Sequence, residues 1–170
     1  MEIEIKRAGD LTPEERKQVD DRLLSEFGDA LTEVVWAEVH WRVLVRVNGL
    51  IASQVEIIER TVSAGERDVK LGGVSGVVTL PEFRGQGLST AALRAAARFL
   101  RDELRIPFGL LICDEAMVSF YSRLGWQPVA GPTVYDQPGE RVVSDGVTMV
   151  LPLSEAAWPN GPIDLRGLPW

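Results

Sequence analysis

Residues 77–90 read VVTLPEFRGQGLST, and this stretch contains the end of a strand, a glycine turn and the start of a helix. Pro81 stops the strand, and Gly85 and Gly87 lie directly before Leu88, where an alanine-rich apolar face with helical spacing begins. The first N–H groups of a helix have no partner inside it and lie at its positive end. The stretch therefore predicts a turn whose backbone can hold a phosphate.

Side chains of the same turn, those of Arg84, Ser89 and Thr90, can add further donors to an anion. Glycine turns before helices are common, so a plain turn without a ligand is the alternative. Two other phosphate motifs do not fit. A Walker loop ends in Gly-Lys-Ser/Thr, which is absent here, and the dinucleotide fingerprint needs a third glycine where Thr90 stands, in an all-parallel unit.

The segments before the turn predict antiparallel strands. Residues 41–62 indicate two strands around Asn48-Gly49, the strongest short hairpin signal, and a third strand follows over about 67–80. Alternation in the third strand fails at Gly72-Gly73 and again at Gly76, where glycine permits a bulge or the close approach of another group. An irregular strand that leads into a glycine turn suggests a site.

The remaining periodicities complete one domain. The expected elements are a strand over 2–6, a helix capped by Thr12, an ambiguous segment over 29–40, a helix over 85–103, a strand over 108–113, a helix over 115–124, a loop over 130–140 and a strand over 146–153. The strand–helix–strand order makes 108–113 parallel to 67–80. The predicted fold class is α+β, with a mixed, mostly antiparallel central sheet flanked by helices, in a single domain over 1–170 with 154–170 as its C-terminal tail.

Composition limits the chemistry. Eighteen Lys+Arg against 25 Asp+Glu give a net charge of −7, which disfavours nucleic acid and favours a cationic partner. Cys113 and His40 are the only residues of their kinds, so neither an internal disulfide nor a zinc set nor a histidine triad is expected, and we predict no metal. The charged N-terminus MEIEIKR and the lack of a long apolar run predict a cytoplasmic protein without a membrane segment.

At this point a family resemblance becomes visible. Arg84-x-x-Gly87-x-Ser89 resembles the acetyl-CoA pyrophosphate loop of the GNAT N-acetyltransferases, usually written Gln/Arg-x-x-Gly-x-Gly/Ala, with serine in the last place. Residues 120–126, FYSRLGW, look like the family's Leu-Tyr-x-x-x-Gly-Phe segment. The resemblance covers about residues 2–153 in the family's order of elements, and it implies a GNAT-like acyl-CoA N-acyltransferase fold.

A closer likeness is to the aminoglycoside 2'-N-acetyltransferases. It runs through Trp36, the hairpin, Gly72-Gly-Val-Ser-Gly-Val77, Gly131-Pro132-Thr133, Asp145-Gly146, Leu151-Pro152 and Trp170. Those enzymes hold a polycationic sugar with acidic residues and with the carboxylate of a terminal tryptophan. The acid expected just before Gly76 is Ser75 here, the one expected before Trp36 is Val35, and a third falls on Asp29 or Ala30.

The resemblance implies a role for each part of the site. The backbone of Val77, Val78 and Thr79 would hold the pantetheine arm of acetyl-CoA like an added strand, and Tyr121 would protonate the departing thiolate. The pyrophosphate would lie on residues of the glycine turn, namely Arg84, Gly85, Gln86, Gly87, Leu88, Ser89 and Thr90. The expected substrate-binding positions are Asp29, Ser75, Asp114, Asp145 and Trp170.

The leading hypothesis is an N-acetyltransferase that moves acetyl from acetyl-CoA to a primary amine of a small cationic acceptor, with aminoglycosides among the candidates. A non-catalytic coenzyme-A-binding module and a protein N-terminal or lysine acetyltransferase are the alternatives. Asp114, Glu115, Glu56, Asp145 and the Trp170 carboxylate stay open as the general base. The sequence also leaves a homodimer open.

Overall fold

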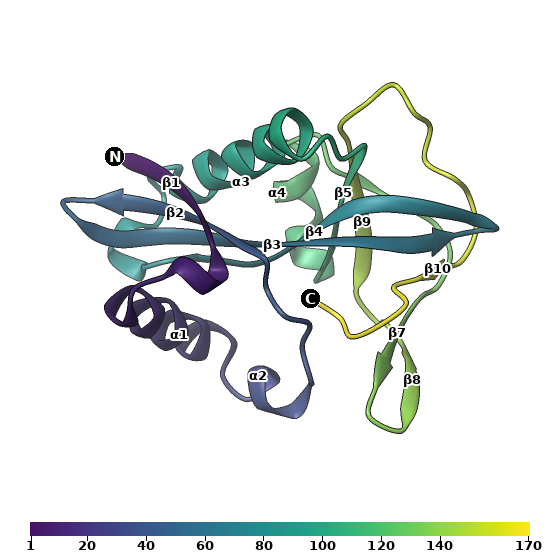
Figure 1. Cartoon of the computed structure of the whole chain (residues 1–170), viewed down its shortest axis with the longest axis horizontal. Coiled ribbons are helices and arrows are strands. Elements are labelled where there is room, and N and C mark those ends of the chain that lie inside the picture. Colours follow the sequence, from purple (N-terminus) through teal and green to yellow (C-terminus); the bar gives the residue numbers. More distant parts are fainter.

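The computed structural model describes residues 1–170, and its ten strands form one mixed sheet (Figure 1). The strands are β1 (Glu2–Arg7), β2 (Trp41–Val47), β3 (Leu50–Ala64), β4 (Arg67–Thr79), β5 (Phe108–Cys113), β6 (Gln127–Pro128), β7 (Thr133–Gln137), β8 (Glu140–Val143), β9 (Val147–Pro152) and β10 (Ile163–Asp164). The helices are α1 (Pro13–Phe27), α2 (Ala30–Glu33), α3 (Leu88–Arg98) and α4 (Val118–Ser122). None of these helices combines the length and the apolar character that crossing a bilayer requires.

The long hairpin of β3 and β4 is the centre of the sheet. One edge of β3 pairs with β2 and, farther along, with β10, while β4 pairs with β3 on one side and β5 on the other. Within the hairpin, Gln54 lies opposite Val78 but Glu56 lies opposite Ser75, so β4 carries one extra residue there. Gly76 has a φ of +54° in this bulge, a backbone conformation that favours glycine. The irregularity predicted at Gly76 is thus confirmed as a β-bulge.

The parallel pairing predicted between β4 and β5 is confirmed, but it is short. It joins only Leu71 to Phe108, Gly72 to Gly109 and Gly73 to Leu110. Past Gly73, the residues of β4 up to Thr79 have no partner strand on the β5 side. The second half of β4 therefore has one unpaired edge inside the sheet.

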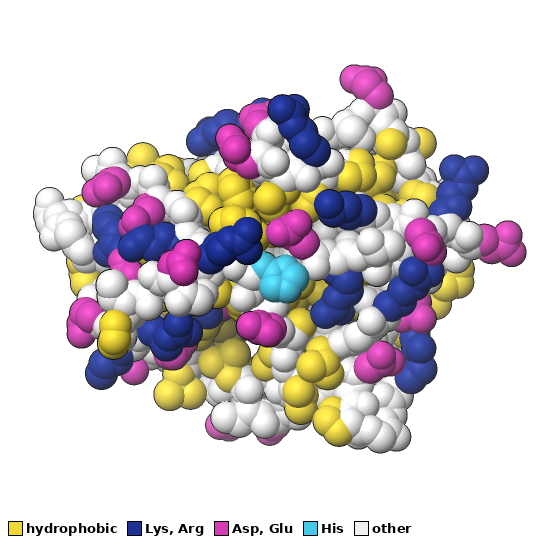
Figure 2. Space-filling model, in the orientation of Figure 1, with side chains coloured by type: hydrophobic (Ala, Val, Ile, Leu, Met, Phe, Trp, Pro, Cys, Tyr) yellow, Lys and Arg dark blue, Asp and Glu magenta, His cyan; other side chains and the backbone are white.

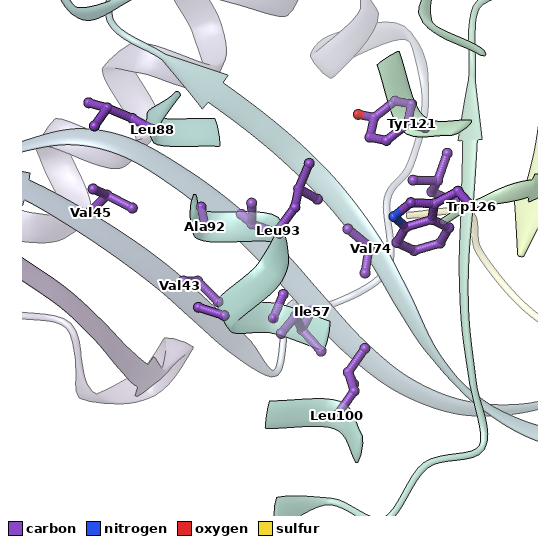
Figure 3. Close-up of a cluster of buried hydrophobic side chains, with 14 of the residues drawn as sticks. Val43, Val45, Ile57, Val74, Leu88, Ala92, Leu93, Leu100, Tyr121 and Trp126 are labelled. Carbon is purple, nitrogen blue, oxygen red and sulfur yellow. The ribbon is translucent and has the colours of Figure 1, made fainter. Parts of the chain in front are cut away.

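Helices cover the two faces of the sheet separately, with α1 and α2 on one side and α3 on the other (Figure 1). On the α3 face, Leu88, Ala92, Leu93 and Leu100 pack against Val43, Val45 and Ile57 of the sheet (Figure 3). On the α1 face, Val19 and Leu23 pack with Leu44, Ile51 and Val78. A third buried cluster, farther along the hairpin, contains Val62, Leu71, Leu110 and Trp170.

The chain after residue 130 differs most from expectation. The predicted loop over 130–140 contains β7 and the start of the β7–β8 hairpin, and the predicted irregular tail contributes β10, which pairs with both β3 and β7. Short strands among glycines and prolines have too few residues for a clear period-two pattern. The helix expected over 85–103 begins at Leu88, and its last turn, Phe99–Glu103, is π-helical. The helix expected over 115–124 is a 3₁₀ turn followed by α4 alone.

The start of α1 is fastened to β1 and β2 by Glu15. The predicted capping box with Thr12 is confirmed, and the carboxylate also accepts hydrogen bonds from Lys6, at 2.9 Å, and from Arg46. Hydrogen bonding from Lys6, followed by that from the Thr12 N–H, lowers the pKa of Glu15 from 4.5 to about 2.

A carboxyl pKa that is lower in the folded state stabilises the fold above the unfolded pKa, and this contribution is lost as pH falls. We expect Glu15→Gln to reduce the free energy of unfolding at about pH 7 by roughly 3 kcal/mol. The difference from wild type should disappear between about pH 5 and about pH 2, as measured by urea unfolding. Glu14→Gln, an exposed neighbour in the same turn, is the control. A constant difference across this pH range would contradict the assignment.

Candidate active site

The turn before α3 presents a row of backbone donors without partners. The N–H groups of residues 85–90 hydrogen-bond to nothing in the chain, and the first amide of the helix that does is Ala91, which donates to Gly87. Gly85 and Gly87 have φ values of +75° and +77°, and a Cβ added at either would meet no atom within 4 Å. The surface there is open, and six consecutive donors at a helix N-terminus fit the diphosphate of a nucleotide-like ligand.

Arg84 connects this turn to α1. Its Nη2 lies 2.6 Å from the Glu26 carboxylate, and its Nε donates to the Thr79 carbonyl at 3.2 Å. Both side chains of the ion pair are about half exposed. The guanidinium is therefore held loosely beside the turn, where it can turn toward an anion at small cost.

The backbone N–H and C=O groups of the last residues of β4 do not all face the same side of the strand. The Leu80 N–H donates to the Ala52 carbonyl of β3, and the Val78 carbonyl accepts a hydrogen bond from Ser53 Oγ at 3.0 Å. Because backbone groups alternate along a strand, those of Val77 and Thr79 face the unpaired edge. Of the three residues expected to hold an added strand, Val77 and Thr79 have the suitable orientation, whereas Val78 faces β3 and buries its side chain under α1.

Tyr121 comes from α4 and lies against the α3 face of the sheet. Its side chain is 7% exposed and packs edge-on to Phe120 and Trp126, with ring centroids 5.1 and 6.2 Å away. Figure 3 shows its hydroxyl pointing away from Trp126 toward β4. Burial, and next the nearby Cys113 thiol, raise the pKa of Tyr121 to about 12. At neutral pH the hydroxyl keeps its proton and can donate it.

A row of polar side chains crosses the opposite face of the sheet, on β2, β3 and β4. Arg42 Nη1 lies 2.7 Å from Glu56 Oε1, and Ser75 Oγ donates to Glu56 Oε2 at 3.2 Å. A Cβ at Gly76 would lie 2.5 Å from the Glu56 carboxyl carbon, so this carboxylate rests directly on the bulge. This polar row, Arg42–Glu56–Ser75, lies between the apolar cluster under α1 and the cluster around Trp170.

The acids left open as the general base have different environments. Glu56 is 8% exposed and lies beside the bulge of β4. Asp114, Glu115 and Asp145 are exposed side chains at the end of the β5–β9 pair, on or beside the residues that follow Cys113. Sequence reasoning ranked neither these four acids nor the fifth candidate, the Trp170 carboxylate. The register that sets Glu56 opposite Ser75 was the missing information, and it depends on the bulge at Gly76.

The expected substrate-binding residues form two groups. Ser75 and Trp170 lie close together on the α1 face, because the Trp170 ring covers Gly73 and its Nε1 donates to the Leu110 carbonyl at 3.3 Å. Asp114 and Asp145 lie at the end of β5, and Asp29 is an exposed residue at the N-terminus of α2. The structure therefore does not bring the five positions together into one pocket.

Charges of both signs are interspersed on the face shown in Figure 2, with His40 near its centre. His40 Nδ1 accepts a hydrogen bond from the Glu59 N–H at 3.0 Å, which gives it a structural role between β2 and β3. No group of three or more His, Cys, Asp or Glu side chains is arranged to hold a metal ion. The overall charge of −7 thus does not appear on this face as one acidic surface.

These features agree with a family comparison. The model of the acetyltransferase (GNAT) domain matches residues 14–129, which is more than half of the chain. The chain belongs to the GNAT acetyltransferase family, as the turn and the Tyr121 segment predicted.

Among individual relatives, an aminoglycoside 2'-N-acetyltransferase of Mycolicibacterium fortuitum is 27% identical over 123 residues. The match covers 72% of this chain and 61% of the relative, so the chain spans less than two thirds of that protein.

Solved structures show the same architecture. The GNAT family N-acetyltransferase YhbS from Escherichia coli, crystallised in complex with CoA, has a TM-score of 0.65 at 16% identity and covers 96% of this chain and 89% of its own. Escherichia coli ElaA has a TM-score of 0.64 at 13% identity and covers 88% and 98%. These likenesses confirm the predicted acyl-CoA N-acyltransferase fold.

Proposed function

We propose that the protein transfers acetyl from acetyl-CoA to a primary amine of a small molecule. The observation that carries this proposal is the row of six unpartnered N–H groups over residues 85–90, which lies next to the unpaired edge of β4. A diphosphate on the turn and an extended arm along β4 have the shape of coenzyme A. Family membership supports the same conclusion.

Each part of the site then has a task. The N–H groups of residues 85–90 bind the diphosphate, with Arg84 as an added donor, and the backbone groups of Val77 and Thr79 hydrogen-bond the pantetheine arm as a strand would. The bound cosubstrate supplies an acetyl thioester. A free N–H near the bulge can donate to the thioester carbonyl oxygen as it gains negative charge.

Two side chains handle the protons. As the amine nitrogen bonds to the acetyl carbon and the carbon–sulfur bond breaks, the nitrogen loses a proton, and we assign Glu56, directly or through a water, as its acceptor. The Tyr121 hydroxyl protonates the departing sulfur, which its raised pKa allows because it stays protonated at neutral pH. The products are an N-acetyl amide and the free thiol of coenzyme A.

The proposed acceptor arrives as an ammonium cation, since a primary amine is protonated in solution, and it releases one proton to water before its neutral nitrogen attacks. The net charge of −7 and the similarity to an aminoglycoside 2'-N-acetyltransferase support including aminoglycosides among the candidates. Ser75 stands where the resemblance to the aminoglycoside 2'-N-acetyltransferases leads one to expect an acid, and this favours acceptors that differ from those of these enzymes. Cytoplasmic location and the oligomeric state stay predictions.

Thiol release from acetyl-CoA tests the proposal. Purified protein is incubated with acetyl-CoA and a panel of small amines, aminoglycosides and lysine-containing peptides, and the thiol is followed with a chromogenic disulfide. We expect release with small amines and none with peptides. Tight coenzyme A binding by calorimetry without any turnover would instead favour a binding module, and turnover of peptides alone would favour a protein acetyltransferase. Absence of coenzyme A binding would overturn the proposal.

A further inference from the structure

Gln54 is a fully buried polar residue in the middle of β3. Its neighbours across the sheet are Leu44 on β2 and Val78 on β4, and both belong to the apolar cluster under α1. The side chain makes a single hydrogen bond, from Nε2 to the Gly76 carbonyl at 3.3 Å, and its Oε1 has no partner. Buried polar atoms are almost always satisfied, so this glutamine needs an explanation. An apolar side chain would avoid the cost of the unpaired oxygen but could not hold the Gly76 carbonyl.

The carbonyl that Gln54 binds belongs to the bulge of β4. There, Gly76 and Val77 together lie opposite the single residue Val55 of β3. The extra residue of a bulge is unpaired and the hydrogen-bond ladder is locally disrupted, so the ladder does not fix how the peptide between Gly76 and Val77 is oriented. The hydrogen bond from Gln54 supplies the missing constraint.

The orientation of this peptide decides where a backbone donor points. The peptide is trans, and in a planar trans peptide the C=O and the following N–H point in opposite directions. Because Gln54 holds the Gly76 carbonyl on the face that α1 covers, the Val77 N–H points away from that face and toward the unpaired edge of β4. Val77 packs with the cluster that contains Tyr121, so the donor and the proposed acid are directed to the same side of the sheet.

We propose that Gln54 is a positioning residue, which aims the Val77 N–H at the carbonyl oxygen of the bound acetyl thioester by holding the Gly76 carbonyl. This inference rests on the proposed function and specifies one of its steps. As the amine nitrogen bonds to the acetyl carbon, the carbonyl electron pair moves onto oxygen, and a donor that is already oriented stabilises the negative charge. The carbonyl re-forms as the carbon–sulfur bond breaks, so Gln54 itself exchanges no proton.

Gln54→Met tests the proposal kinetically, because it keeps the length of the side chain and removes the donor. We expect kcat with the amine that wild type acetylates fastest to fall roughly ten- to a hundredfold, less than the loss typical of deleting an oxyanion donor outright. The affinity for coenzyme A, which lacks the acetyl carbonyl, should stay close to that of wild type by calorimetry. Thr148→Val is the control, since it removes a buried hydrogen bond of 2.6 Å between β9 and Thr133 of β7 and should leave kcat unchanged.

The infrared spectrum of bound acetyl-CoA gives a readout that a purely structural role would not change. A hydrogen bond to a carbonyl oxygen weakens the C=O bond and lowers its stretching frequency. With an isotope label on the acetyl carbonyl and no amine present, we expect a lower frequency on wild type than on Gln54→Met. Thr148→Val should give the wild-type frequency. Equal frequencies on wild type and Gln54→Met would overturn the inference.

Two further results would overturn the inference while the proposed function stands. The first is an unchanged kcat in Gln54→Met. The second is a loss of coenzyme A affinity as large as the loss of kcat, because Gln54 would then support the whole site rather than one peptide. If wild type neither binds coenzyme A nor releases thiol, both proposals fail. Urea unfolding shows whether each variant is folded under the assay conditions, and Gln54→Leu, which also lacks a donor, takes the place of Gln54→Met if the latter is unstable.

Discussion

Replacing Tyr121 with phenylalanine is expected to lower kcat by roughly a hundred- to ten-thousand-fold, the contribution that general acids typically make. The substitution removes one oxygen from a ring that keeps its packing against Phe120 and Trp126, so the fold should be retained. Without the hydroxyl no donor of the chain is assigned to the departing sulfur. The affinity for coenzyme A, measured by calorimetry, should stay close to that of wild type.

The pH dependence adds a second readout. Since the pKa of Tyr121 is raised to about 12, the hydroxyl keeps its proton throughout the neutral and mildly alkaline range. Wild-type kcat should therefore show no loss toward alkaline pH from this group until well above about pH 10. Tyr135→Phe changes the other tyrosine of the chain, which lies on β7, and should leave kcat unchanged. An unaltered kcat in Tyr121→Phe would remove this residue from the mechanism.

Replacing Glu56 with glutamine is expected to lower kcat roughly a hundredfold or more, because the amide cannot accept the proton of the attacking amine. The substitution also leaves Arg42 without its counter-ion, so the free energy of unfolding should fall by about 3 kcal/mol or more. Urea unfolding separates the two effects, since kcat is measured where the variant is fully folded. Glu59→Gln, on the same strand but the opposite face, should keep both activity and stability.

Moving the carboxylate from β3 to β4 gives a second test of the role assigned to Glu56. Ser75 lies opposite Glu56 and hydrogen-bonds to it at 3.2 Å, so a carboxylate at position 75 reaches the same place from β4. We expect Ser75→Glu to restore part of kcat when it is combined with Glu56→Gln. Full activity in Glu56→Gln alone would show that another group accepts the proton. A double variant no faster than Glu56→Gln would show that the carboxylate must come from β3 to act as the base.

Local patterns were sufficient for the cofactor side of the site. The hairpin at Asn48-Gly49, the capping box at Thr12 and the glycine turn before Leu88 each depend on a few adjacent residues, and the structure has all three. The free N–H groups follow from the same local information, because any helix that begins without a capping side chain leaves them unpaired.

The acceptor side depends on long-range geometry, and the sequence could not predict it. Arg42, Glu56 and Ser75 form a row only because a single extra residue at Gly76 shifts the register of β4 against β3. Arg22 lines a groove with Val78 and Thr79 because α1 packs against the end of β4, and nothing in the helix pattern indicates which strand a residue faces. The docking of Trp170 on Gly73 joins residues far apart in the chain, which no periodicity records.

The unpaired edge along the second half of β4 has a consequence for handling the purified protein. An unprotected strand edge is a template on which another chain can add itself, and proteins normally hide such edges or make them short. Here the edge has to stay available, because on our proposal a small molecule completes it. Bound coenzyme A would then cover this strand edge. Protein from which coenzyme A has been removed is therefore expected to self-associate more readily than protein that has it bound.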